Sequence, residues 1–210
     1  MASNCEEGRL GVEYVLCRVE PEALKPTEAP RPFMAAKAVI LDIETSSLEA
    51  DAGVVVGAGL MPEKGRAEYF PVRRTGEEKN ALLKLVEHLQ EFDLVLTWNG
   101  RFFDIPFLTT RLLSHNLDPR PIATMRHVDL NEVVKNRLKL TFTYLDHVCN
   151  FFGIEKKRGT MGMDVPRLYV RALEGDRRAL GVIREHCLDD LQATRKVYLR
   201  LKPLLEGFLA

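Results

Sequence analysis

Short apolar runs separated by turn residues mark the strands of this chain. They predict strands over residues 37–43, 53–61 and 66–72, and the spacing, with only residues 62–65 between the last two runs, is typical of consecutive antiparallel strands. Two further runs predict buried strands over residues 92–98 and 125–130. Strands come first along the chain and alternate with helical segments later. This order predicts an α/β fold whose sheet contains strands of mixed direction.

Apolar residues at helical spacing fill the segments between these strands. Thr75 and Glu78 have the spacing of a capping box, which predicts a helix of about four turns behind them. A second helix is predicted over residues 104–115, where Pro106 occupies the first turn. Both helices follow strands, as in other α/β proteins.

The C-terminal half is predicted to be mainly helical. A second capping-box pattern begins at Thr143, and the helix that it opens is expected to end at Gly153 in a left-handed conformation. Residues 166–208 predict two or three helices, with breaks at Gly175 and Gly181.

The first 36 residues differ in character from the rest. Alternation over residues 10–19 indicates a strand, but four prolines lie between Pro21 and Pro32, which is typical of a linker or an extended arm. We therefore expect an N-terminal extension or arm over residues 1–36 and a folded domain over residues 37–210.

Two carboxylates follow the apolar run of the first predicted strand. Asp42 and Glu44 are one residue apart, so their side chains share a face of the strand, about 6.5 Å apart along it. Close carboxylates repel each other unless a cation lies between them. Because Mg²⁺ and Mn²⁺ prefer oxygen ligands, this pair predicts a divalent metal site at the end of the strand.

Two other segments supply candidate residues for the same site. Asp104 follows the turn pair Asn99-Gly100 and is either the N-cap of the next helix or a third carboxylate facing the first two. The local sequence does not separate these alternatives. Helical projection places Asp190 on an apolar face, where an unpaired acid is costly. His186 lies one turn earlier on the same side, and both a structural and a catalytic role are open for it.

Composition narrows the class of protein. The chain has 210 residues, 46% of them hydrophobic, and a formal net charge of +0. One globular domain is expected, and a polyanion site must be built locally from clustered cations or metal ions. The N-terminus has no signal-peptide core and no run is long enough to cross a bilayer, so we expect an intracellular, cytoplasmic protein without a membrane partner. Four unpaired cysteines are expected to be reduced, Cys149 and Cys187 being buried.

The acidic segments, taken in order, form a recognisable set of motifs. They are Asp42-Ile43-Glu44-Thr45, Asn99-Gly100 leading to Phe103-Asp104-Ile105-Pro106, and His186-x-x-x-Asp190. The set resembles the three exonuclease motifs of the DEDD superfamily, the DnaQ-like 3′–5′ exonucleases with a ribonuclease H-like fold. The second and third motifs look particularly like those of the YprB-like predicted nucleases and of family B DNA polymerase proofreading domains. One such motif alone is weak evidence, but three in order are a specific signal.

The resemblance implies a five-stranded mixed sheet flanked by helices and a site that holds two divalent metal ions, Mg²⁺ or Mn²⁺. Asp42, Glu44, Asp104 and Asp190 would bind these ions. His186 departs from the family pattern, in which a tyrosine precedes the last aspartate by four residues or a histidine precedes it by five. In this position His186 would orient the attacking water or act as the general base.

Residues beside the motifs are expected to contact the substrate. An aromatic ring there can stack on a terminal base, although two of the three aromatic residues near the second motif are expected to fill the core. A basic loop before the last helices is expected to bind the phosphate backbone of the nucleic-acid substrate. The candidates are Thr45, Asn99, Phe103, Lys156, Lys157 and Arg158.

The sequence therefore predicts a metal-dependent 3′–5′ exonuclease that hydrolyses phosphodiester bonds at single-stranded or frayed DNA or RNA ends and releases nucleoside monophosphates. A non-catalytic nucleic-acid-binding or protein-interaction module of the same fold, and a structure-specific endonuclease, are the alternatives. Inward acids that repel one another without metal favour the enzyme. The arm over residues 1–36 is the expected contact for a polymerase or repair partner, or for self-association.

Overall fold

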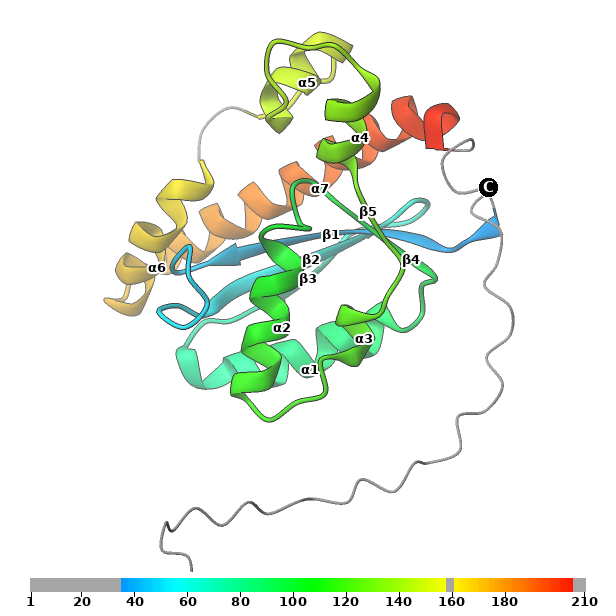
Figure 1. Ribbon diagram of the computed structural model, residues 1–210. Coiled ribbons are helices and arrows are strands. Elements are labelled where there is room, and N and C mark those ends of the chain that lie inside the picture. Colours follow the sequence, from blue (N-terminus) through cyan, green and yellow to red (C-terminus); the bar gives the residue numbers. More distant parts are fainter. Residues whose placement is uncertain (1–34, 158–160, 206–210) are drawn as a thin grey trace, which may run out of the picture. The chain divides into compact units, whose positions relative to one another are not determined.

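One mixed sheet of five strands organises the domain. The computed structural model describes residues 35–157 and 161–205; the strand expected over residues 10–19 and the candidate Arg158 lie outside this part of the chain. The sheet has the order β3-β2-β1-β4-β5 (Figure 1). Its strands are β1 (Ala38–Thr45), β2 (Val55–Pro62), β3 (Glu68–Pro71), β4 (Leu94–Thr97) and β5 (His127–Asp129).

Strand directions divide the sheet into two halves. β1, β2 and β3 are consecutive and antiparallel, which confirms the prediction from the short apolar runs. β4 is parallel to β1, and β5 is parallel to β4. The sheet is therefore mixed, and β1 lies at its centre with partners on both sides.

Helices cover both faces of this sheet (Figure 1). On one face lie α1 (Glu78–Leu89), α2 (Asp104–Ser114) and α3 (Arg120–Ala123). On the other lie α4 (Leu130–Arg137), α5 (Leu145–Phe152) and α7 (Arg177–Leu205), while α6 (Val165–Leu173) packs beside α7. The short helices α3 and α4 were not expected from the sequence. None of the helices among the described residues is long and apolar enough to cross a membrane.

The alternation of side chains along β1 separates two hydrophobic clusters. Val39 and Leu41 point toward α1 and α2, whereas Ala38 and Ile40 point toward α7. Because side chains alternate with a period of two, Asp42 continues the row of Ala38 and Ile40. The acidic residues of β1 therefore lie on the α7 face, where the hydrophobic row ends.

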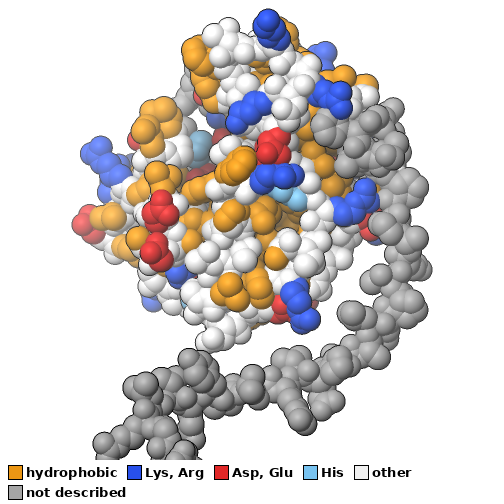
Figure 2. Space-filling model, in the orientation of Figure 1, with side chains coloured by type: hydrophobic (Ala, Val, Ile, Leu, Met, Phe, Trp, Pro, Cys, Tyr) orange, Lys and Arg blue, Asp and Glu red, His pale blue; other side chains and the backbone are white. Residues whose placement is uncertain are grey.

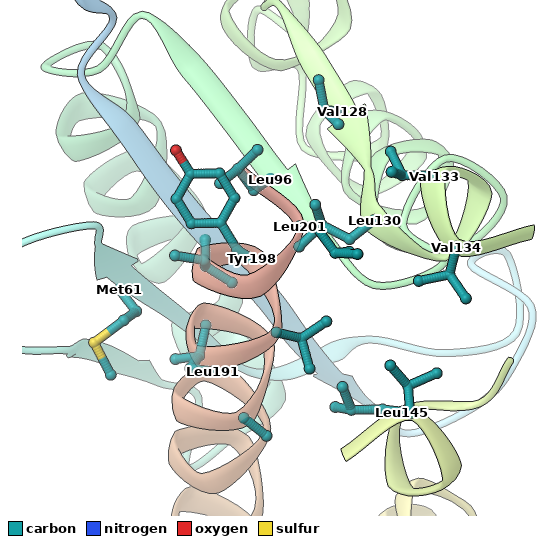
Figure 3. Packing of buried hydrophobic residues seen from close by; sticks show 14 of the residues in the cluster. Met61, Leu96, Val128, Leu130, Val133, Val134, Leu145, Leu191, Tyr198 and Leu201 are labelled. Carbon is teal, nitrogen blue, oxygen red and sulfur yellow. The ribbon is translucent and has the colours of Figure 1, made fainter. Parts of the chain in front are cut away.

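The long helix α7 closes the core on that face. Figure 3 shows Leu191 and Leu201 of α7 in one cluster with Leu96 of β4 and Leu145 of α5. The break expected at Gly181 is wrong, since α7 runs through this residue from Arg177 to Leu205. A glycine inside a helix costs only about 1 kcal/mol, which the burial of a continuous apolar stripe easily offsets. The break at Gly175 is confirmed, and its φ is +109°.

Both expected capping boxes are wrong for a shared reason. The side chain of Glu78, 1% exposed, does not bond to the start of its helix. Its carboxylate instead accepts hydrogen bonds from the backbone N–H of Val55 at 2.8 Å and from the guanidinium of Arg111 at 2.6 and 2.9 Å, and it lies 2.8 Å from His115 Nε2. The second box fails similarly, because Asp146 pairs with a lysine rather than with its own helix. Tertiary partners override both local patterns.

Replacing Glu78 by Gln is expected to lower the free energy of unfolding by about 3 kcal/mol, because Arg111 then lacks its buried partner. Burial opposes ionisation of Glu78, but the hydrogen bonds from Arg111, His115 and Val55 outweigh it and lower the pKa of Glu78 below its usual 4.5. This stabilisation is thus present above about pH 4.5 and is lost as the pH falls through the lower pKa of the folded state. Urea unfolding at several pH values measures it. The exposed acid Glu87 of the same helix provides the control, since Glu87→Gln should change stability by less than about 0.5 kcal/mol.

Candidate active site

A pocket of about 340 Å³ opens at the carboxyl end of β1. Seven acidic or basic side chains line it, and they come from β1, α2, α5 and α7 and from the segment after α5. These are Asp42, Glu44, Asp104, Asp146, Lys156, His186 and Asp190. The structure thus brings together all five residues that the sequence nominated for catalysis, and adds Asp146 and Lys156 to them.

The two acids of β1 reach the pocket because their strand neighbours leave room for α7. Asp42 pairs across the sheet with Gly59 of β2. A Cβ atom at Gly59 would lie 2.5 Å from Leu191 Cδ1 and 2.8 Å from Cys187 Sγ, so only glycine lets α7 approach this closely. Glu44 is 5% exposed and Asp42 is half-buried. The approach of α7 sets the distance between its own polar residues and the acids of β1.

Asp104 begins α2 but does not cap it. Its Oδ1 accepts a hydrogen bond of 3.1 Å from the backbone N–H of Ile43, the residue between the two acids of β1. Burial raises the pKa of Asp104 to about 7, although this hydrogen bond favours the ionised form. Of the two alternatives left open by the sequence, the geometry favours a third carboxylate facing the strand.

His186 and Asp190 project into the pocket from successive turns of α7. His186 Nδ1 lies 3.6 Å from Asp190 Oδ1, and His186 Nε2 lies 3.9 Å from Glu44 Oε1. The imidazole, whose side chain is 9% exposed, therefore sits between one acid of β1 and one of α7. Asp189 does not line this pocket and accepts a hydrogen bond from the backbone N–H of Lys157.

The carboxylates of the pocket resist ionisation together. Burial raises the pKa of Asp42 well above its usual value, and repulsion from Glu44, Asp190 and Asp104 adds to the effect. Burial followed by repulsion from Asp190 and Asp104 does the same for Glu44. The pKa of Asp190 is also raised by burial, against the attraction of His186 and Lys156. A divalent cation among these oxygens would relieve the repulsion, so the residues present fit the metal site implied by the motifs.

Cys187 lies close to this group without joining it. Ligand atoms of Asp42, Glu44 and Cys187 are within 4.8 Å of one another, which sequence reasoning did not foresee. Burial, with the neighbouring carboxylates, raises the pKa of the Cys187 thiol well above its usual value, so the thiol stays protonated. Its Sγ lies 3.9 Å from the backbone oxygen of Asp42. The expected burial of Cys149 and Cys187 as free thiols is confirmed.

Lys156 enters the pocket instead of projecting from a solvated loop. Its Nζ lies 2.9 Å from Oδ1 of both Asp146 and Asp190, and its side chain is 10% exposed. Although burial opposes the charge, these ion pairs raise the pKa of Lys156. Lys157 is exposed, as expected of a residue in a basic loop. Lys156 thus partly neutralises one of the candidate metal ligands.

Replacing Lys156 by Met is expected to lower the stability of the metal-free protein by about 2 kcal/mol, because Asp190 and Asp146 lose their cation in a half-open site. Mn²⁺ should then raise the melting temperature more in this variant than in the wild type. Thermal unfolding in EDTA and in Mn²⁺ measures both effects. Lys157→Met is the matched control, and equal metal-induced shifts in all three proteins would contradict the assignment.

The turn of the second motif is held by a residue that sequence reasoning missed. Asp129, 2% exposed at the end of β5, accepts hydrogen bonds from the backbone N–H groups of Asn99 (2.9 Å), Arg101 (3.0 Å) and Asn131 (2.9 Å). Asn99 is left-handed with φ +65°, and a Cβ atom at Gly100 would lie 2.5 Å from Thr97. The available signal was an acid directly after the short apolar strand of residues 125–130.

The remaining substrate candidates occupy different surroundings. Thr45 is 8% exposed, and its hydroxyl donates a hydrogen bond of 2.7 Å to the Ser47 oxygen. Phe103 is half-buried, lines the pocket and packs against Phe107 with ring centroids 5.6 Å apart. Trp98 packs against the core, while Phe102 is 67% exposed. Asn99 and Phe103 are thus the candidates of the second motif that border the acids.

A five-stranded mixed sheet in the order β3-β2-β1-β4-β5, flanked by helices and carrying acids on its central strand, is typical of the ribonuclease H-like class of α/β proteins. The family described as the RNase_H superfamily matches residues 39–202 of this chain. The chain belongs to that superfamily, and the predicted fold class is confirmed.

Two archaeal polymerases are similar to this chain. It is 33% identical over 99 residues to a DNA polymerase of Methanocaldococcus jannaschii, an alignment that covers 38% of this chain and 6% of the polymerase. The structure of the family B DNA polymerase from Pyrobaculum calidifontis matches with a TM-score of 0.73 at 20% identity, covering 83% of this chain and 25% of that one. The chain therefore corresponds to a small part of each polymerase, and the resemblance to family B DNA polymerases expected from the motifs is confirmed.

Proposed function

We propose that this chain is a metal-dependent 3′–5′ exonuclease that hydrolyses phosphodiester bonds at single-stranded or frayed DNA or RNA ends and releases nucleoside monophosphates. One observation carries the proposal. Asp42, Glu44, Asp104 and Asp190 converge on one pocket, and the pKa of each is raised. Such an arrangement destabilises a protein without metal but suits ion binding. Similarity to two DNA polymerases supports a nucleic-acid substrate.

The proposed cofactors are two divalent cations, Mg²⁺ or Mn²⁺, held by these four carboxylates. When bound, such ions supply an activated water and stabilise the charge that develops on the leaving oxygen. The donor set is made of carboxylate oxygens, which are the ligands that these two metals prefer.

His186 is the proposed proton acceptor. A neutral imidazole can take the proton of a water that lies beside Glu44 and Asp190, the two acids that flank the ring at 3.9 and 3.6 Å. His186 is therefore proposed to take the role of the tyrosine that precedes the last aspartate by four residues in the family pattern.

Replacing His186 by Ala is expected to lower kcat by about a hundredfold or more, which is the usual contribution of a general base. Mn²⁺ binding should persist, because the four carboxylates remain. Single-turnover cleavage of a labelled oligonucleotide measures the first effect, and the Mn²⁺-induced shift in melting temperature measures the second. The exposed neighbour supplies the control as Glu185→Ala. Unchanged turnover in His186→Ala would show that the residue has a structural role and not a catalytic one.

Substrate contacts and partners are proposals of the same kind. Asn99 and Phe103 line the pocket and are proposed, together with Thr45 at the end of β1, to bind the terminal nucleotides. Lys156 and Lys157 are proposed to contact phosphates, together with Arg158. The N-terminal arm is proposed to recruit a polymerase or repair partner or to mediate self-association, in a cytoplasmic protein.

The function is tested by Mn²⁺-dependent degradation of a 5′-labelled oligonucleotide, run in parallel as DNA and RNA. We expect a ladder that shortens from the 3′ end, nucleoside monophosphate products and arrest by a 3′-blocking group. Internal cleavage of the blocked substrate would identify an endonuclease instead. Binding without any product would identify a non-catalytic module.

A further inference from the structure

Three aromatic rings form an exposed cluster just before and within the first turn of α5, outside the acidic motifs. The ring centroids of Phe142, Tyr144 and His147 are separated by 5.5, 5.4 and 5.6 Å in the three pairs. Phe142 is 52% exposed and Tyr144 is 57% exposed. Because the rings already contact one another, a ligand that stacks on this ring cluster has little side-chain freedom left to remove.

The ring cluster is continuous with the acidic pocket. Tyr144 belongs to both, and the next two residues, Leu145 and Asp146, also line the pocket. Lys156 joins Asp146 to Asp190 across the pocket. A chain molecule whose end reaches the carboxylates therefore passes close to the rings.

Basic residues precede the ring cluster along the chain. Lys135 and Arg137 lie in the last turn of α4, and Lys139 follows it; all three are exposed. Figure 2 shows Lys and Arg side chains among hydrophobic ones over α4 and α5, at the top of the view. The pocket repels a polyanion when metal is absent, so cations outside the pocket are needed to hold the rest of a strand. Exposed rings among lysines and arginines are typical of single-strand binding surfaces, whereas protein interfaces are depleted of lysine at their core.

We propose that the ring cluster is a stacking platform for unpaired bases of the strand whose 3′ end enters the acidic pocket. Stacking on a protein ring requires that a base leave its own duplex neighbour, so the platform selects single-stranded or frayed nucleic acid. The orientation of the nucleic-acid strand, with its 3′ end in the pocket, rests on the proposed function. The binding of unpaired bases by the platform does not depend on that function.

The platform is tested on the full chain with Phe142→Ala, because Phe142 does not line the pocket. Two substrates are compared in Mn²⁺: an oligothymidylate, and the p-nitrophenyl ester of thymidine 5′-monophosphate, which has a single base and therefore no further nucleotide that could stack on Phe142. The ratio of kcat/KM for the oligonucleotide to that for the ester should fall about tenfold, mainly through KM. Phe142→Tyr should retain the wild-type ratio. Phe151→Ala removes another exposed ring, which lies on α5 outside the cluster, and should leave the ratio unchanged.

A scan of single abasic positions makes the test specific. In the wild type, one or two positions should reproduce the tenfold loss, and Phe142→Ala should be nearly insensitive at those positions. Additive losses, or an unchanged ratio in Phe142→Ala, overturn the platform. If the ring cluster instead mediates self-association, the ratio will be unchanged in Phe142→Ala. The sedimentation coefficient of the wild type will then depend on protein concentration, and Phe142→Ala will abolish that dependence.

Binding measured in Ca²⁺ by fluorescence anisotropy separates the two proposals. If the wild type hydrolyses neither substrate but Phe142→Ala weakens strand binding about tenfold, the platform stands and the exonuclease proposal fails. If hydrolysis proceeds from the 3′ end with an unchanged ratio and unchanged binding, the exonuclease stands and the platform fails.

Discussion

Replacing Asp42 by Asn is expected to reduce oligonucleotide cleavage by at least about a thousandfold while raising the melting temperature of the metal-free protein. Metal coordination supplies several kcal/mol of transition-state stabilisation, and each 1.36 kcal/mol corresponds to about tenfold in rate. Stability moves the other way because repulsion between Asp42 and Glu44 is removed. Opposite changes in activity and stability distinguish a metal ligand from a residue that supports the fold.

The measurement compares cleavage rates in Mn²⁺ with melting temperatures in EDTA across pH. Carboxyl groups whose pKa is raised in the folded state stabilise it at low pH, and this contribution is lost as the pH rises through the folded pKa, which is about 7 for Asp104. The stability gained in Asp42→Asn should therefore be largest above neutral pH. Asp189→Asn is the control, because this neighbouring acid does not line the pocket. Loss of activity that accompanies loss of folding would refute a metal role for Asp42.

Replacing Asp129 by Ala is expected to cost about 3 kcal/mol of stability and about a hundredfold in cleavage rate. Three backbone N–H groups lose their acceptor, one in a buried place and two in partly buried places, and each loss in a fully buried place costs about 1 to 3 kcal/mol. The turn of Asn99 and Gly100 is then free to shift, and a displacement of about 1 Å at a reacting centre costs about a hundredfold.

Chemical denaturation and single-turnover cleavage measure the two effects of Asp129→Ala. Activity is compared at a temperature where the variant remains folded, so that the positioning of the turn is separated from unfolding. Asp118→Ala serves as the control, since Asp118 is a surface acid paired with Arg120 and should contribute less than about 0.5 kcal/mol. A variant that is less stable but equally active would show that Asp129 supports the fold alone.

The sheet and the acids of β1 were predictable because their signals are local. Alternation fixes which residues share a face of a strand, so Asp42 and Glu44 were placed together from the sequence. The side of α7 that carries His186 and Asp190 follows equally from helical spacing. The side chains of these residues point toward the pocket in directions that follow from the strand or helix to which each residue belongs.

Residues whose side chains bond to partners far away in the sequence were not predictable in the same way. Glu78 has the spacing of a helix cap but bonds to Arg111, which lies 33 positions later. Lys156 belongs to a basic run typical of a solvated loop, yet it pairs with Asp190. Gly181 is a residue type that often ends a helix, but α7 continues through it because the apolar stripe of this helix is buried. In each case the deciding interaction forms only when separate segments pack together.

The close contact of α7 with Gly59 has a consequence for motion. His186 and Asp190 lie on the same stiff helix that buries Leu191 and Leu201 against the sheet, so this wall of the pocket has no hinge of its own. Moving these two side chains away from β1 would require the core to open. Hydrogen exchange in the middle of α7 is therefore expected to report on global unfolding, and movement of the pocket walls is expected in segments outside this helix, such as the start of α5 and the segment that carries Lys156.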